Sequence, residues 1–511
     1  MPSHKYKKSY LIEKFDEILG KSLEEVDEIN FFEDVEEYAL QKGVVGSLIE
    51  QGVLRYPPDT RQEADLIVVD EDKEIKTELK TTGMLVSLSP KKHYIAKEPM
   101  SITAVGIYNL AEQIFEESHF WAKLEHMLII YYQYMSNHPV RPVEYRTFPI
   151  RGYEFHEFSE IEKEGLKHDW ENVKSLVTEV VSNHIGVHDA EWKKQVRQEY
   201  IEKHGRLRKI LNYIDLAPKF PPRFRLKKPI VSNMIAQHFG YDLEQLPGRY
   251  VTFDDIDRKC KELKKKYFGK KISELVSEFG ITKIKKKNLA ESIIVSMFGG
   301  TKKINQIEMF KRFGIIAKSI TISTKGKRTE DMKLFRVDFE EFVRTEIVDD
   351  SAEIRPIIFE DSEIYSYFTD YEFLCILFQE TDNDDNNAKN TLLNNKFIGF
   401  KRLVFSDEFI YGPVKKLWED TRDKIINHKL EDVIDFDKKG IPKINKNGIT
   451  KSAPNFMKSK ENVVFIRGGG VDSSHKTEMV NGIKMLPQHV WIKGAAVVKE
   501  LDISLDDIKS L

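Results

Sequence analysis

Three segments from the first half of this 511-residue chain recur in the second half, at nearly constant distances of 249, 245 and 238 residues. They are GKSLEEV from Gly20 and GKKISEL from Gly269, Lys42–Glu50 and Lys287–Val295, and the strand-like segments around Lys80 and Lys318. A repeat with so long a period restricts the chain to two copies of one domain. We expect the copies to join near residue 250, as domains 1–250 and 251–511.

Composition excludes several other classes of protein. Hydrophobic residues make up 41% and charged residues 32% of the chain, which is typical of a globular protein and too apolar for a disordered one. The two cysteines, Cys260 and Cys375, have no paired spacing, which excludes a disulfide scaffold, a zinc ribbon and a CxxC redox site. No run approaches the roughly 18 apolar residues of a membrane span, and the N-terminus has no apolar signal core. We therefore expect a soluble cytoplasmic protein with no membrane partner.

Charge is unevenly distributed along the chain. The net charge is −3, yet residues 251–330 hold 20 Lys and Arg against 9 Asp and Glu, with runs at Lys264–Lys266 and Lys285–Lys287. This basic region predicts a surface for a polyanion, and a solvated helix face remains the alternative. The polar segment Thr381–Asn395 is typical of a surface insertion.

Two neighbouring segments of the first half have strand patterns. Ala64–Val69 is short and apolar, and Ile75–Thr81 alternates with period two, which places Glu78 and Lys80 on one face. Further strands are expected at Ser101–Val105 and Met127–Tyr132. Helical patterns bracket these strands, so the sequence predicts a mixed α/β fold.

Asp65, Glu78 and Lys80 are the strongest candidates for chemistry. Two carboxylates from adjacent strands that converge on one point suit a magnesium ion, which serves phosphodiester hydrolysis by neutralising the phosphate and activating water. A lysine two residues after the glutamate projects to the same side and can position the water or offset developing charge. Glu-x-Lys occurs five times in the chain, and only at Glu78 does it lie in an alternating strand that follows an apolar one. An exposed hairpin with ordinary ion pairs remains the alternative.

Two further residues precede the apolar strand from Met127. His119 is a candidate general base, although a lone histidine is more often structural. Lys123 is a candidate phosphate contact, and a solvated helix residue is its alternative.

An ordered set of segments resembles the MutH-like endonucleases, a family that includes a mismatch-repair nicking enzyme and GATC-cutting type II restriction enzymes, some with a duplicated fold. In the first half the segments are KGVVGSLIE (42–50), Asp65, ELKT (78–81) and SHFWAKLEHMLII (118–130). In the second half they are GPVKKLWEDT (412–421), VFIR (464–467) and MLPQHVWIK (485–493), which resemble the two-domain restriction members. The resemblance implies an α/β protein of two restriction-endonuclease-like domains, each a mixed β-sheet flanked by helices.

The resemblance also implies roles for single residues. Asp65 and Glu78 would bind Mg²⁺, with the Leu79 carbonyl as a further metal ligand. Lys80 would be the catalytic lysine, and Glu50 and Lys123 would support the active site.

The second copy departs from this pattern. Val295 and Ile316 stand where the first copy has Glu50 and Glu78, and only Lys318 remains. A site without carboxylates does not hold a hard cation, so we expect this domain to bind DNA as an effector site without cutting it.

Recognition residues are expected in both copies. In the second, Arg467 aligns with an arginine that the family uses on its target, and arginine suits guanine in the major groove. Trp491 and Lys493, in the same half, are further candidates for DNA contact. The alternatives are a phosphate contact for Arg467 and core packing for Trp491. In the first copy, Arg223 and Arg225 lie in the matching segment.

These observations predict a magnesium-dependent, site-specific endonuclease for double-stranded DNA, a type II restriction enzyme for GATC or a related site. A strand-nicking enzyme for hemimethylated DNA and a non-cleaving DNA-binding protein on a decayed nuclease fold remain the alternatives. Double-stranded DNA is the expected partner, and dimerisation of the protein on DNA is a further hypothesis. A cognate DNA methyltransferase is expected as a separate gene product rather than as a bound subunit.

Overall fold

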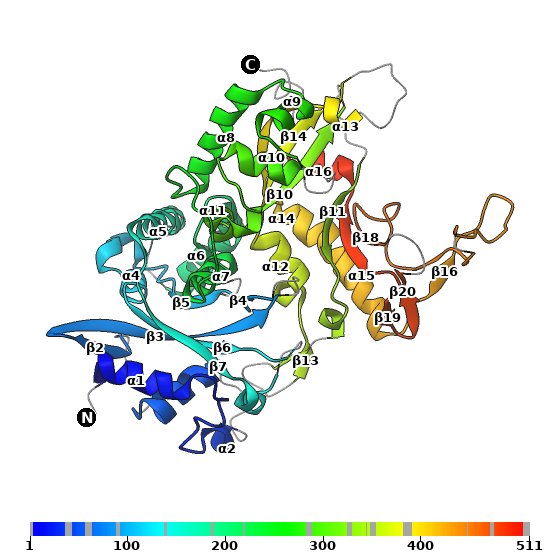
Figure 1. The fold of residues 1–511 in the computed structure, drawn as a ribbon. Helices are drawn as coiled ribbons and strands as arrows, with labels where there is room; N and C mark the ends of the chain where they lie inside the picture. The colour runs from blue at the N-terminus through cyan, green and yellow to red at the C-terminus, as the bar shows by residue number, and fades with distance from the viewer. Residues whose placement is uncertain are drawn as a thin grey trace. The chain divides into compact units, whose positions relative to one another are not determined.

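The computed structural model divides the chain into two compact units (Figure 1). Unit 1 comprises residues 1–256, 305–314 and 346–355, and unit 2 comprises residues 257–304, 315–345 and 356–511. Within them the structure describes residues 4–35, 43–56, 64–87, 92–136, 140–184, 186, 189–217, 220–282, 289–323, 330–343, 345–347, 354–381, 391–446, 448–470 and 475–503.

The main sheet of unit 1 has the strand order β1-β2-β3-β6-β7, and β4 pairs with the far end of β3. Its strands are β1 (Lys5–Lys7), β2 (Leu66–Asp70), β3 (Lys73–Val86), β4 (Tyr94–Ala96), β6 (Met127–Gln133) and β7 (Ile150–His156). The β1–β2 and β3–β6 pairs are parallel, whereas β2–β3 and β6–β7 are antiparallel. Three of the four expected strands are therefore present in this sheet as β2, β3 and β6. β3 is longer than its alternating pattern indicates.

Helices and a smaller sheet complete unit 1. The helices are α1 (Lys8–Ile18), α2 (Phe31–Val35), α3 (Val44–Leu48) with its π-helical continuation η1 (Ile49–Val53), α4 (His119–Ala122), α5 (Glu160–Ser182), α6 (Ala190–Lys203), α7 (Lys228–His238) and α11 (Glu308–Arg312). The smaller sheet has the order β5 (Met100–Ala104), β9 (Arg223–Leu226), β8 (Ile214–Leu216).

The core of unit 1 lies where α1 and α3 cover the main sheet. Leu11 and Phe15 from α1 and Leu48 from α3 share one hydrophobic cluster with Leu79 and Leu128 from the central strands. These helices are amphipathic, so burial of their apolar face against the sheet is their main source of stability.

Unit 2 contains two three-stranded sheets. One has the order β10 (Ile315–Ile322), β14 (Glu372–Gln379), β15 (Lys396–Leu403), and the other β11 (Met332–Arg336), β21 (Gln488–Ile492), β18 (Val464–Gly468). Its larger helices are α8 (Phe253–Tyr267, which begins in unit 1), α9 (Ile272–Glu278), α10 (Leu289–Met297), α12 (Glu363–Thr369), α15 (Lys415–Ile426) and α16 (Gly494–Glu500).

The internal repeat recurs in the backbone pairing of the two units. The amide of Gly20 donates to Ile150 in β7, and the amide of Gly269 donates to Phe397 in β15, both at 2.8 Å. Both glycines have a positive φ that disfavours other residues. In each unit the first strand of the shared core pairs in parallel with the second, which pairs antiparallel with the third. The two units therefore share this strand pairing and this glycine contact, as the repeat in the sequence predicts.

Some expectations concern residues outside the described ranges. Residues 283–288, which include the Lys285–Lys287 run, and residues 382–390 of the expected insertion are among these, whereas Thr391–Asn394 form the helix α13. Lys265 and Lys266 of the other basic run are exposed on α8, but the stem of Lys264 lies against Gly399. Among the described residues, no helix is long and apolar enough to cross a membrane.

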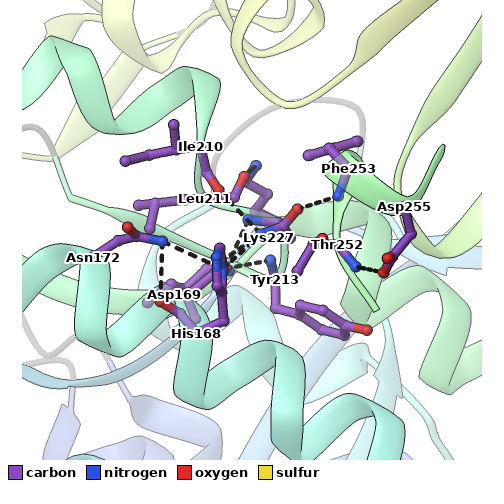
Figure 2. Close-up of polar contacts among 12 residues, drawn as sticks. His168, Asp169, Asn172, Ile210, Leu211, Tyr213, Lys227, Thr252, Phe253 and Asp255 are labelled. Carbon is purple, nitrogen blue, oxygen red and sulfur yellow. Dashed lines mark hydrogen bonds and ion pairs between the residues drawn. The ribbon is translucent and has the colours of Figure 1, made fainter. Parts of the chain in front are cut away.

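A buried carboxylate in unit 1 fixes the joint between α5 and β8. Asp169 on α5 is fully buried, and one of its oxygens accepts the amides of Asn212, Tyr213 and Ile214 at 2.6–3.1 Å. The Asn212 side chain donates to the other oxygen at 2.7 Å and accepts the amide of Phe253 at the start of α8. Figure 2 shows these contacts around Asp169, Tyr213 and Phe253.

We predict that Asp169→Ala lowers the free energy of unfolding of unit 1 by at least about 3 kcal/mol, because each buried amide left without an acceptor costs roughly 1–3 kcal/mol. Calorimetric unfolding measures the effect. Asn172→Ala, one turn further along α5, serves as the control and should change stability little. Equal unfolding temperatures for Asp169→Ala and the wild type would contradict this role.

Candidate active site

The structure brings together five residues that the sequence analysis selected. They are Glu50 on η1, Asp65 immediately before β2, Glu78 and Lys80 on β3, and Lys123 at the end of α4. β3 pairs with β2 as far as Thr77 and with β6 from Glu78 onward, and Glu78 is only 4% exposed. The alternative of an exposed hairpin face is therefore wrong.

Two lysines neutralise the buried Glu78. The Lys80 amine donates to one of its carboxylate oxygens at 2.7 Å, and the Lys123 amine donates to the other at 2.6 Å. Burial of a carboxylate is tolerable only with such partners. Lys123 is therefore an ion-pair partner of the central carboxylate and not a solvated helix residue.

The other two carboxylates are crowded. Asp65 accepts the amide of Leu79 at 2.9 Å, but burial and the nearby Glu78 raise its pKa to about 6. Burial, Asp65 and Glu78 raise the pKa of Glu50 to about 7. Three acidic groups thus lie within electrostatic range of one another at one buried point, as in many catalytic sites.

Two more residues border this cluster. Tyr56 adjoins Glu50 and stacks on His4 with ring centroids 4.4 Å apart, and burial raises the pKa of its hydroxyl. Burial, together with the positive charge of Lys123, lowers the pKa of His119, so its imidazole is neutral near pH 7 and able to accept a proton. Sequence reasoning missed Tyr56, because it precedes the apolar strand without a pattern of its own.

The donor set fits a hard divalent cation. Carboxylate oxygens are the ligands that magnesium prefers. Burial and then repulsion raise the pKa values of Asp65 and Glu50, and a cation would relieve the repulsion. Within the described ranges, no three acidic or histidine residues are already arranged around a metal position. In this metal-free arrangement both oxygens of Glu78 are paired with lysines. A metal role of the Leu79 carbonyl stays a prediction.

Comparison with known proteins agrees with this geometry. Residues 54–169, which contain Asp65, Glu78, Lys80 and Lys123, match the family model of the DNA mismatch repair enzyme MutH. This segment of unit 1 is similar to the MutH endonucleases. The chain is also 24% identical over 410 residues to the type II restriction enzyme Sau3AI of Staphylococcus aureus, a match that covers 75% of this chain and 77% of that protein. Both matches indicate a site-specific deoxyribonuclease of the MutH-like type.

Unit 2 has the frame of the MutH-like site without its acids. Lys318 faces Cys375 across the β10–β14 pair as Lys80 faces Ile129 across β3–β6, and Ile316 takes the register position of Glu78. Val295 is buried on α10. Among the described residues of unit 2, no strand pairs with the free edge of β10, so a counterpart of β2 and its preceding aspartate is also missing.

The retained lysine has a different partner. The Lys318 amine donates to the carbonyl of Lys333 on β11 at 2.7 Å, and burial lowers its pKa to about 8. Lys318 therefore joins the two sheets of unit 2, whereas Lys80 binds a carboxylate of the MutH-like site.

The candidate recognition residues of unit 2 form a stack on the outer face of its second sheet. The guanidinium of Arg467 lies 4.9 Å from the ring centroids of both Phe465 and Trp491, and Asp331 pairs with it at 2.8 Å. Trp491 is half-buried, and its indole nitrogen is enclosed without a hydrogen-bond partner in the described structure. Lys493 lies between the end of β21 and the start of α16.

The matching face of unit 1 has different side chains. The β8–β9 and β18–β21 pairings are equivalent, with Ile214 opposite Leu226 and Val464 opposite Ile492. This register places Arg225 at the position of Trp491, where Asp215 binds it through two hydrogen bonds of 2.8 Å. Arg223 is exposed and donates to Ser101 at 3.1 Å.

The raised pKa values predict that the metal-free protein loses stability as pH rises. A carboxyl group with a pKa of about 7 when folded and 4.5 when unfolded binds more protons in the folded state, so the free energy of unfolding falls between about pH 4.5 and pH 7. Glu50→Gln should flatten this fall in the free energy of unfolding, whereas Glu13→Gln on the exposed face of α1 should not. Unfolding temperatures in a chelator at pH 5 and pH 8 measure the effect. Identical profiles for Glu50→Gln and the wild type would contradict the assignment.

Proposed function

We propose that this protein is a magnesium-dependent endonuclease that cuts both strands of duplex DNA at a specific site, as a type II restriction enzyme. The observation that carries the proposal is the buried cluster in which Glu50, Asp65 and Glu78 meet two lysines. The match to a type II restriction enzyme over three quarters of both chains supports it. GATC or a related sequence is the proposed target.

Each residue of the cluster has a role in this reaction. Asp65 and Glu78 would hold Mg²⁺ with Glu50 beside them, and the ion would neutralise the scissile phosphate and activate water. The amine of Lys80 would position the attacking water. Lys123 would keep its ion pair with Glu78 and offset the charge that develops on the phosphate.

Unit 2 is proposed to bind a second copy of the site as an effector. Val295 and Ile316 occupy the positions of Glu50 and Glu78, so this part of unit 2 has no carboxylate for a metal ion there. Arg467, Trp491 and Lys493 remain on the surface of unit 2 for DNA. DNA binding uses such a surface and needs no metal. Dimerisation on DNA and protection of the host by a separate methyltransferase belong to the same proposal.

Plasmid cleavage separates this function from its alternatives. With magnesium, a restriction enzyme converts an unmethylated circle to linear DNA, a nicking enzyme leaves an open circle, and a protein that only binds DNA leaves the plasmid unchanged.

Glu78→Ala is predicted to abolish cleavage, because it removes a metal ligand and the partner of two lysines. Binding to duplex DNA in calcium should persist, since phosphate contacts elsewhere supply most of the affinity. Glu74→Ala on the exposed part of the same strand is the control and should cut normally. Near-normal cutting by Glu78→Ala would refute the site.

The effector role predicts that a plasmid with one target is cut slowly and that a second target, or an added uncleavable duplex, accelerates the reaction. A coupling free energy of roughly 1–3 kcal/mol corresponds to a 5- to 150-fold effect. Arg467→Ala should remove the acceleration and keep the slow basal rate. Equal rates on one-site and two-site plasmids at limiting enzyme, or loss of basal cutting in Arg467→Ala, would contradict this division of roles.

A further inference from the structure

A segment of unit 2 between α15 and β18 is exposed along almost its whole length. From Glu431 to Lys451 every described residue is exposed except Asp435 and Asn445, which are half-buried. The segment leaves the body of unit 2 as the antiparallel ribbon β16 (Asp432–Ile434) and β17 (Ser452–Pro454), near the β16 label in Figure 1. We call the ribbon and the described residues between its strands the arm.

The arm contains a tandem repeat of eight residues. FDKKGIPK (436–443) is followed directly by INKNGITK (444–451), with lysine, glycine, isoleucine and lysine at the same four positions. Each copy makes one tight turn, in which the amide of Gly440 donates to Asp437 at 3.1 Å and that of Gly448 to Asn445 at 2.9 Å. Both glycines have a φ near +78°, the left-handed conformation that such turns require.

The two turns are held together by a closed ring of backbone hydrogen bonds. Lys443 donates to Asp435, Asp435 to Lys451, and Lys451 to Lys443, at 2.7–2.8 Å. The Asp435 carboxylate also pairs with both lysines, at 2.9 and 3.1 Å. The arm is therefore a preorganised structure without a hydrophobic core.

The outer surface of the turns combines apolar and basic side chains. Large apolar residues are 46–67% exposed, namely Phe436, Ile441, Ile444 and Ile449. Lys438, Lys439 and Lys446 lie at the turn tips and make no ion pair within the described part of the chain. The arm, residues 432–454, contains five lysines and three aspartates, in a chain whose net charge is −3. Single exposed apolar residues are normal on a monomer, whereas four within one short segment are typical of an interaction site.

We propose that the arm is a DNA-gripping element, in which the tip lysines contact backbone phosphates and the isoleucines enter the minor groove. Proteins that enter this groove combine basic residues with apolar wedges that part neighbouring bases, and a two-stranded ribbon is narrow enough to carry them. The excess of lysine favours a polyanion over an apolar protein surface as the partner. The inference rests on the proposed function, and it assigns to unit 2 a contact separate from Arg467 and Trp491.

Three variants test the proposal on the full-length protein bound to duplex DNA in calcium. The first is the triple change Lys438→Gln, Lys439→Gln and Lys446→Gln. The second is the double change Ile441→Ser and Ile449→Ser. The third replaces residues 436–450 by two glycines, which the hydrogen bond between Asp435 and Lys451 allows. The control is Lys458→Gln, Lys460→Gln and Lys499→Gln, which removes the same charge from exposed positions of unit 2.

Each variant has its own expected result. The lysine variant should reduce the slope of log affinity against log salt by about 2.7, since each lost phosphate contact contributes about 0.9. The control variant should change this slope by less than about 0.9. The isoleucine variant should keep the slope and lose the fluorescence increase of 2-aminopurine placed in the duplex, which reports parted bases. The glycine replacement should show both losses at an unchanged unfolding temperature.

Other outcomes would overturn the inference. Salt slopes and 2-aminopurine signals equal to those of the wild type would exclude the arm from DNA binding. If the wild type is a dimer, and the glycine replacement makes it monomeric without altering DNA binding, then the partner of the arm is a second copy of the chain. If the wild type neither binds nor cuts DNA, the proposed function fails as well. If it does both and the arm variants match it, only the inference about the arm fails.

Discussion

Burial of a carboxylate between two lysines is the interaction on which the candidate active site of unit 1 depends. Glu78 occupies the middle of the central strand, where an unpaired negative charge would be very costly. Lys80 comes from the same strand, whereas Lys123 is supplied by a short helix that leads into β6. The sheet order therefore determines which groups meet at this point, and the crowded Asp65 and Glu50 make it receptive to a divalent cation.

The second unit keeps the strands of the first but has no buried carboxylate at the position of Glu78. Its three core strands keep the pairing of the first, and its lysine is retained at the same register position. With isoleucine and valine at the carboxylate positions, that lysine turns to a backbone carbonyl of the neighbouring sheet. The same frame thus supports either a charged cluster or a structural joint, and under the proposed function the second unit binds DNA without cutting it.

The sequence was sufficient for the parts of the site that depend on local pattern. Period-two alternation identified the strand of Glu78, and the repeat identified its counterpart at Ile316, because both signals lie within short segments. Tyr56 was missed because its place beside Glu50 arises from tertiary packing. The role of Asp169 was missed for the same reason, since its partners lie more than 40 residues away. The arm escaped notice because turn chemistry, and not hydrophobic periodicity, specifies it.

Calorimetric titration of the metal-free protein with Mg²⁺ at pH 6.5, in two buffers of different ionisation enthalpy, tests the central claim most directly. Because the pKa values of Glu50 and Asp65 are near 7 and 6, the account predicts that binding releases protons, so the measured heat depends on the buffer. It also predicts that Asp65→Asn no longer binds the ion and that Lys318→Met in unit 2 binds it as the wild type does. Undiminished binding by Asp65→Asn would contradict the claim that unit 1 holds the catalytic metal through its crowded carboxylates.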